Sequence, residues 1–131
     1  LPGVKLPEDM FFPADDKEAV EGRDLLVMAV ASAYTRTTAH RLSSLVVQDQ
    51  KILNVAKGIE EHTLMTLSEI IEQEIPQADV AVMSGPSHAE EVGRGIPTTI
   101  VVGARSKATA EYIQNLSISA RMCWEWSWAV P

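Results

Sequence analysis

The sequence predicts an α/β domain in which helices lie on the faces of a mostly parallel sheet. Short apolar runs of strand length alternate along the chain with segments of helical periodicity, which is typical of strand–helix–strand units. Two of these runs consist mostly of apolar residues, as expected of parallel strands that are covered on both faces. Together these observations favour part of a layered α/β sheet over an all-α or all-β domain.

Composition and charge narrow the class further. The chain has 131 residues, of which 46% are hydrophobic, enough for one domain with an apolar core. Its formal net charge of -7 argues against nucleic acid as a partner, because binding phosphates requires a surplus of Lys and Arg. We find no apolar run of membrane-spanning length and no signal segment. The single Cys123 permits no internal disulfide, so we expect a reducing, cytoplasmic location without membrane contact.

The first residues should form an arm and a short helix. Leu1–Pro13 contains three prolines and is expected to be a loop or an extended arm. Asp15 and Glu18 have the spacing of a helix-capping pair, and Gly22 is placed to end the helix that they begin.

Two apolar strands and a helix should follow. Leu25–Val30 is continuous and apolar and is expected to be a buried strand. A helix is expected from Ala31 to about Leu45. The next apolar run, Ile52–Ala56, ends before Gly58 and predicts a second buried strand, with Lys57 where the strand gives way to its loop.

The second half predicts two more helices and two more strands. Thr63 is expected to cap a helix whose apolar positions recur at helical spacing until Pro76; these positions are Leu64, Leu67, Ile70, Ile71 and Ile75. Strands are expected at Val80–Met83 and Ile96–Gly103. The last helix, Ala108–Leu116, should bury a face made of Tyr112, Ile113 and Leu116.

Two stretches are candidates for chemistry. Lys57 faces the carboxyl ends of the strands, where ligands gather in open α/β sheets, although a solvated lysine at the end of a strand is the simpler interpretation. Ser84–Ser87 (SGPS) precedes a predicted helix. Ser87 stands three residues before Glu90, as in a capping box, and Gly85 would supply an unusual backbone angle. The same turn could instead hold a phosphate or a carboxylate.

Three stretches of the sequence resemble NAD(P)-dependent glycerol-3-phosphate dehydrogenase of the bacterial type. They are Leu1–Pro7 (LPGVKLP), Asn54–Ile71 (NVAKGIEEHTLMTLSEII) and Met83–Val92 (MSGPSHAEEV), and the resemblance runs nearly unbroken to Leu116. It implies a partial Rossmann-like, doubly wound sheet, the second half of an N-terminal dinucleotide-binding domain. It also implies NAD or NADP as cofactor and, in the full-length family, a homodimer.

The resemblance also implies site residues. Lys57 would contact both the substrate and the nicotinamide end of the cofactor, as the one residue here with a catalytic role. Gly85 and Ser87 would line the substrate site, while Ser32 and Ala89 would lie along the cofactor. The family reaction moves a hydride between NAD(P)H and dihydroxyacetone phosphate, giving sn-glycerol 3-phosphate for phospholipid synthesis. A cation at the substrate carbonyl would stabilise the alkoxide that forms. No metal is implied.

The chain departs from the family pattern in ways that bear on activity. It contains no G-x-G-x-x-G after a strand, the turn that holds the pyrophosphate of a dinucleotide. The family also takes its general acid/base lysine from a later, all-helical domain. We therefore expect the isolated chain to be an inactive fragment of such an oxidoreductase. The alternative is a non-catalytic Rossmann-like module that binds a nucleotide, a phosphate or a partner.

The tail predicts a break in the reading frame. Residues 1–116 should form the domain, whereas Ser117–Pro131 holds all three tryptophans and resembles nothing in the family. Codons compatible with Trp124–Trp128, read in a shifted frame, give Leu-Gly-Val/Met-Glu-Leu-Gly, which is the core of the family's next segment. An edge strand or a membrane-surface patch is the competing interpretation. DNA that lacks Val-Glu-Leu-Gly-Gly in every shifted frame would exclude the frameshift.

Overall fold

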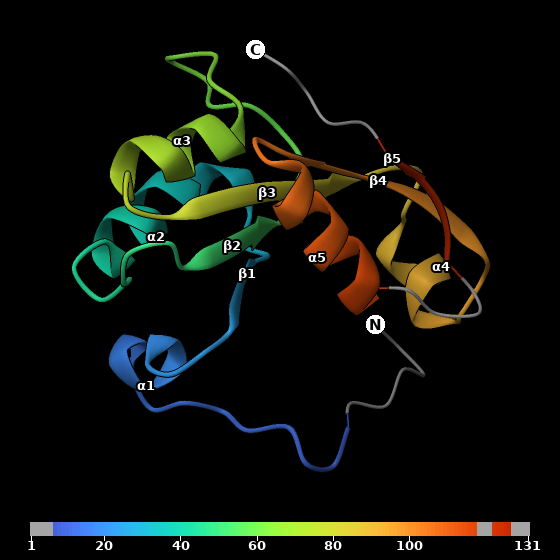
Figure 1. The fold of residues 1–131 in the computed structure, drawn as a ribbon, viewed down its shortest axis with the longest axis horizontal. Coiled ribbons are helices and arrows are strands. Elements are labelled where there is room, and N and C mark those ends of the chain that lie inside the picture. Colours follow the sequence, from blue (N-terminus) through green and yellow to red (C-terminus); the bar gives the residue numbers. More distant parts are fainter. Residues whose placement is uncertain (1–6, 118–121, 127–131) are drawn as a thin grey trace.

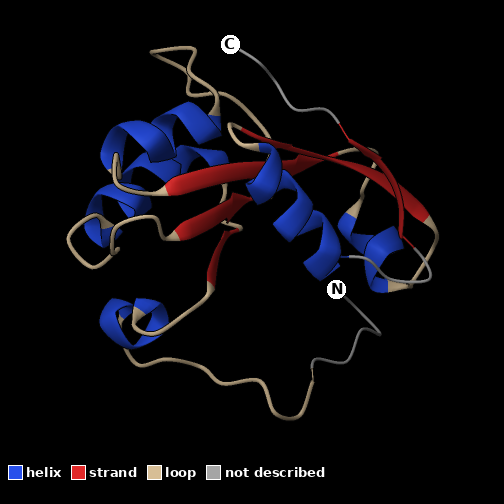
Figure 2. Cartoon of the chain, in the orientation of Figure 1, coloured by secondary structure: helices blue, strands red, loops and turns tan. Residues whose placement is uncertain are grey.

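A computed structural model describes residues 7–117 and the backbone of residues 122–126. Its five strands form one sheet in the order β1-β2-β3-β4-β5, and Figure 2 shows the strands in red between helices. The strands are β1 (Leu25–Met28), β2 (Lys51–Asn54), β3 (Asp79–Ser84), β4 (Thr98–Ala104) and β5 (Met122–Trp126). This is the mostly parallel α/β sheet that the sequence predicts.

Helices cover both faces of the sheet (Figure 1). They are α1 (Asp16–Val20), a 3-10 turn η1 (Ser32–Tyr34), α2 (Thr35–Leu42), α3 (Leu67–Glu74), α4 (Ala89–Gly93) and α5 (Lys107–Ser117). Consecutive residues of β2 show the two-sided burial: Ile52 packs with Ile71 of α3, and Leu53 packs with Ile113 of α5. The predicted burial of this strand on both faces is thus confirmed for Ile52 and Leu53 of β2.

The direction of the strands places the loops that matter for function. β1, β2 and β3 run parallel to one another, whereas β4 is antiparallel to β3. The carboxyl ends of the three parallel strands therefore lie at the same end of the sheet. The loops that follow Met28, Asn54 and Ser84 leave from this carboxyl end of the sheet, where ligands of open α/β sheets bind.

The arm and the first helix form as predicted within the described residues. Residues 7–13 contain neither helix nor strand, while the rest of the predicted arm lies outside the described part. The Asp15 side chain accepts a hydrogen bond from the backbone N–H of Glu18 and so caps α1. Gly22 has φ +71° just after the helix, a conformation that glycine adopts without strain.

The predicted cap of α3 is wrong by one turn. Thr66, not Thr63, begins the helix, in a capping box where Thr66 and Glu69 satisfy each other's backbone N–H groups. Thr63 lies in the preceding loop and donates to Glu60 instead. Leu64 is also outside the helix, with φ +59° and a side chain 70% exposed. Both threonines have a cap-like position in the sequence, but only Thr66 has a glutamate three residues later.

Other boundaries shift where tertiary contacts intervene. α2 stops at Leu42, three residues early, where the Gln77 side chain donates to the carbonyls of Ser43 and Val46. Leu116 does not share the buried face of α5, because its side chain is 56% exposed. β2 ends at Asn54, before Val55 and Ala56. The strand predicted at Leu25–Val30 ends at Met28 and is only partly buried.

The end of the described chain forms an edge strand. β5 pairs in parallel with β4, as the alternative interpretation of the tryptophan-rich segment expects. Backbone pairing does not report on the reading frame, so the division of the chain at residue 116 stays a prediction. The other residues of that segment lie outside the described part. No helix in the described residues is long and apolar enough to cross a membrane.

We predict that the chain self-associates through β1, the other edge of the sheet. The Met28 carbonyl accepts a bond from the N–H of Val55, the residue that follows β2, so the backbone groups of Leu25 and Val27 face away from the sheet. Val27 is 55% exposed, and an apolar edge without a charged residue favours pairing. The net charge of -7 opposes association only over about 8 Å at physiological salt.

Val27→Lys should reduce this association, because a charge on the edge opposes strand pairing. Analytical ultracentrifugation of both proteins at micromolar concentrations would measure it. A monodisperse, cooperatively unfolding monomer of the unmodified chain would contradict the prediction.

Candidate functional site

The turn after β2 is shaped by a buried asparagine. Asn54 is 2% exposed; its side-chain oxygen accepts from the Ala56 N–H, and its side-chain N–H donates to the Ala56 carbonyl, both at 3.2 Å. The two bonds fix the direction in which the chain leaves the sheet. Lys57 follows immediately, with an exposed side chain. A lysine at this point lies at the end of the sheet where β1, β2 and β3 have their carboxyl ends.

One carbonyl oxygen, that of Gly85, joins the loops after β2 and β3. Lys57 Nζ donates to it at 2.8 Å. The Ser87 N–H donates to the same oxygen at 2.8 Å, and the Ser87 hydroxyl lies 3.4 Å from it. The structure therefore brings together Lys57, Gly85 and Ser87, three residues that the resemblance singles out. A lysine ammonium has three donors, so this bond leaves Lys57 able to donate to a ligand.

Only glycine fits at position 85. A Cβ there would lie 2.6 Å from the Thr99 carbonyl oxygen, closer than real Cβ atoms come, and a tight 3.1 Å from the Ile100 Cα. The predicted capping role of Ser87 is wrong. α4 begins at Ala89 with His88 at its cap and no side-chain cap bond, and the Ser87 hydroxyl instead points to the Gly85 carbonyl. Gly85 thus lets the β3 loop approach β4 closely.

Ser32 lies against the β2 loop. Its Cβ and Oγ are 3.1 and 3.3 Å from where a Cβ on Gly58 would stand, and Gly58 has φ +129°. The loop after β1 and the loop after β2 are therefore in contact beside Lys57. Ala89, the other residue expected along the cofactor, opens α4 with an exposed side chain. A hollow of about 430 Å³ next to Ser32 is lined by Ser32, Ala33, Ile59, Glu60, Glu61 and His62.

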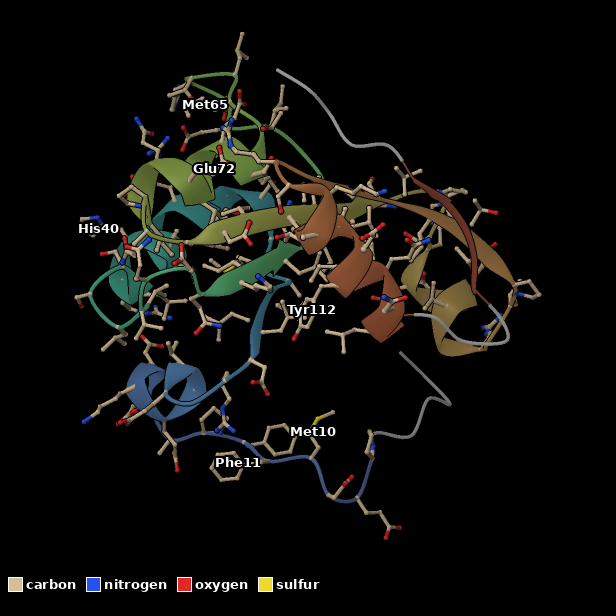
Figure 3. All side chains as sticks on the ribbon, in the orientation of Figure 1. Met10, Phe11, His40, Met65, Glu72 and Tyr112 are labelled. Carbon is tan, nitrogen blue, oxygen red and sulfur yellow. The ribbon has the colours of Figure 1, made fainter. Side chains whose placement is uncertain are left out.

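An ion-pair network, which the sequence did not predict, ties the β2 loop to two helices. Arg36 of α2 binds Glu60 with two parallel bonds of 2.7 Å. The same guanidinium donates to Gln73 and Glu74 of α3 at 2.7 and 2.6 Å. Thr63 adds a hydroxyl bond to Glu60 at 2.5 Å. Figure 3 shows this region near Met65, where the loop passes over the helices.

These contacts lower the pKa of two carboxyl groups. The guanidinium of Arg36, followed by the Thr63 hydroxyl, lowers the pKa of Glu60 from 4.5 to about 2. The bond from His40, followed by that from Arg36, lowers the pKa of Glu74. Both carboxylates are thus stabilised in the charged form by hydrogen bonds that form in the folded chain.

We predict that Glu60 makes folding sensitive to acid. Its folded pKa lies below the unfolded value, so its contribution is complete above about pH 4.5 and is lost as the pH falls from there towards 2. Glu60→Gln should lower stability at pH 7 and lose less stability than the unmodified chain over that window. Urea unfolding midpoints at pH 7, 4.5 and 3 would measure this. Equal pH dependence in both proteins would show that Glu60 does not contribute.

No group of His, Cys, Asp and Glu in the described residues could hold a metal ion. The site instead consists of a cation, a backbone carbonyl and small loops at the carboxyl end of the sheet. A cation that faces this open end can bind an anionic or carbonyl oxygen.

The chain matches a known family model over residues 1–110, described as the NAD-dependent glycerol-3-phosphate dehydrogenase N-terminus. It is 58% identical over 116 residues to glycerol-3-phosphate dehydrogenase [NAD(P)+] of Agathobacter rectalis, covering 88% of this chain and 34% of that protein. It is 50% identical to the enzyme of the same name from Fusobacterium nucleatum, covering 88% of this chain and 35% of that protein. The chain thus spans about a third of the length of these curated relatives.

Solved structures show the same fold. A glycerol-3-phosphate dehydrogenase crystal structure from Coxiella burnetii superposes with a TM-score of 0.87 at 24% identity, covering 97% of this chain and 39% of that chain. A structure from Dunaliella salina gives the same TM-score at 20% identity, covering 97% of this chain and 22% of that chain. At these identities the likeness shows the fold alone, a Rossmann-like α/β sheet.

Proposed function

Because the chain belongs to the family of the NAD-dependent glycerol-3-phosphate dehydrogenase N-terminus, we propose that it forms part of the cofactor domain of such an oxidoreductase. The reaction is hydride transfer between NAD(P)H and dihydroxyacetone phosphate, giving sn-glycerol 3-phosphate. The observation that carries the proposal is the bond of 2.8 Å between Lys57 Nζ and the Gly85 carbonyl. It places a cation at the carboxyl ends of three parallel strands, between the loops after β2 and β3 that carry the motifs of the family.

Lys57 is proposed as the catalytic residue of this chain. Its ammonium is anchored by one bond and keeps two further donors for the substrate. A donor that is held in place before the reaction stabilises negative charge on the substrate carbonyl oxygen without reorganising. Gly85 and Ser87 form the other wall of the substrate site, where the Ser87 hydroxyl lies 3.4 Å from the carbonyl that holds Lys57.

The residues present fit a nicotinamide cofactor at this end of the sheet. Gly58 and Gly85 keep the backbone of two loops free of side chains, and Ser32 lies against Gly58. We propose that Ser32, Lys57 and Ala89 contact the cofactor, which would supply the hydride. We also propose a cytoplasmic enzyme of phospholipid precursor synthesis that acts as a homodimer when full length.

A chimera tests the proposed function. The stretch of this chain that aligns with the Agathobacter rectalis relative replaces its counterpart in that protein. Oxidation of NADH and of NADPH is then followed with dihydroxyacetone phosphate. We expect turnover that depends on both the cofactor and the substrate. A folded chimera without turnover, beside an active parent enzyme, would contradict the proposal and favour a non-catalytic nucleotide- or phosphate-binding module.

A further inference from the structure

The loop that follows Lys57 is held at few points. Gly58 and Ile59 are exposed, and the loop closes on itself through the Glu60 N–H bond to the Met65 carbonyl at 2.9 Å and an isolated bridge between Ile59 and Thr66. Because Thr66 is the N-cap of α3, these local bonds tie the loop to the start of that helix but not to α2. Its position relative to α2 depends on a side chain that reaches it from that helix.

Arg36 supplies the described side-chain contacts from α2 to this loop. Its side chain is 30% exposed and that of Glu60 21%, so the pair is partly shielded from water. A guanidinium bound to a carboxylate by two parallel bonds fixes orientation as well as distance. The remaining nitrogen of the guanidinium, Nη1, donates to Gln73 and Glu74 of α3. The loop is thereby fixed to α2 and α3 at once.

This attachment bears on Lys57 through the neighbouring contacts. Ser32 begins η1, and Arg36 is the second residue of α2 directly after that turn. Glu60 stands three residues after Lys57. Ser32 in turn lies against Gly58. The pair therefore closes a ring that runs from Ser32 through α2 to Arg36, across to Glu60 and back along the chain to Gly58. Lys57 leaves this ring to reach the Gly85 carbonyl.

We propose that Arg36 and Glu60 are positioning residues that hold the Lys57 ammonium at the Gly85 carbonyl. The proposal rests on the proposed function only where it concerns catalysis; the placement of Lys57 is a property of the chain itself. A lysine carbon chain has many rotamers. Fixing the backbone from which it departs limits the positions that the ammonium reaches.

The test measures how fast each lysine of the full 131-residue chain reacts with an amine-specific acylating reagent, with mass spectrometry of the peptides. Arg36→Met should raise the labelling rate of Lys57 about tenfold relative to Lys51, the factor expected when a charge-assisted hydrogen bond no longer holds its donor. Arg36→Lys keeps the charge but loses the two parallel bonds, so it should give an intermediate rate. Glu60→Gln should resemble Arg36→Met.

Arg105→Met is the matched control. Arg105 also binds a glutamate of α3, with two bonds of 2.8 and 2.5 Å to Glu72. It does so from the loop after β4, at the end of the sheet opposite Lys57. It should leave the ratio of Lys57 to Lys51 labelling unchanged. A change of the same size in Arg105→Met and Arg36→Met, or no change in Arg36→Met, would overturn the proposal.

A kinetic measurement separates this proposal from the proposed function. In the chimera, Arg36→Met should lower kcat more than it raises KM, because a displaced donor is lost from the transition state. If Lys57→Met leaves kcat/KM unchanged while Arg36→Met still raises Lys57 labelling, then the positioning role stands and the catalytic assignment fails. The reverse pattern would remove the positioning role and leave the proposed function.

Discussion

Replacing Lys57 with methionine in the chimera should lower kcat/KM for dihydroxyacetone phosphate by about a hundredfold or more. That is the scale on which an active site loses rate when one preorganised donor is removed. Methionine keeps the aliphatic stem and removes only the charge and the donors. Because Lys57 is exposed and its one described bond goes to a loop carbonyl, the fold should survive.

Lys107→Met is the control for this substitution. Lys107 is also an exposed lysine; it begins α5 and pairs with Glu111 at 3.5 Å. It follows β4, which is antiparallel to β3, so it lies at the end of the sheet opposite Lys57. Steady-state kinetics at saturating cofactor should show parent-like rates for Lys107→Met. An unchanged kcat/KM for Lys57→Met would return Lys57 to the simpler interpretation of a solvated lysine at a strand end.

The strands were predictable because their burial is written locally. Ile52 and Leu53 are consecutive apolar residues whose side chains point to opposite faces of the sheet, and the structure buries both. Leu25–Val30 has the same composition but forms an edge strand, with Val27 exposed. The sequence cannot distinguish the two, because the difference lies in what pairs with the outer side of the strand.

Two parts of the site could not be predicted from local patterns. The Arg36–Glu60 pair joins residues 24 positions apart, and an arginine on a helix is most often solvated. Asn54 offered a weaker signal, since an asparagine at the end of a buried strand favours a side-chain turn. Its two bonds to Ala56 set the path to Lys57. Capping was predicted correctly at Asp15 and wrongly at Thr63 and Ser87, where Thr66 and His88 take the cap positions.

The Gly85 carbonyl gives the other prediction with a large expected effect. Gly85→Ala would place a Cβ 2.6 Å from the Thr99 carbonyl oxygen. The oxygen is a backbone atom and a Cβ is fixed by its own backbone, so neither can rotate away as the end of a side chain would. Relief requires the β3 loop to move from β4, which shifts the carbonyl that holds Lys57. We expect a loss of about 1–3 kcal/mol from overpacking, with about 1 kcal/mol or more from the φ of +157°.

Gly22→Ala separates the two contributions. Gly22 also has a positive φ, +71°, but nothing lies within 4 Å of the position that its Cβ would take. This variant should therefore lose only the conformational part, about 1 kcal/mol, and keep Lys57 in place. Urea unfolding measures both variants, and the labelling rate of Lys57 reports on the carbonyl. Gly85→Ala should be the less stable of the two and the only one with faster labelling of Lys57. Equal stability of the two variants would mean that the loop moves away from Thr99 at no cost, and that close packing does not determine the choice of glycine at position 85.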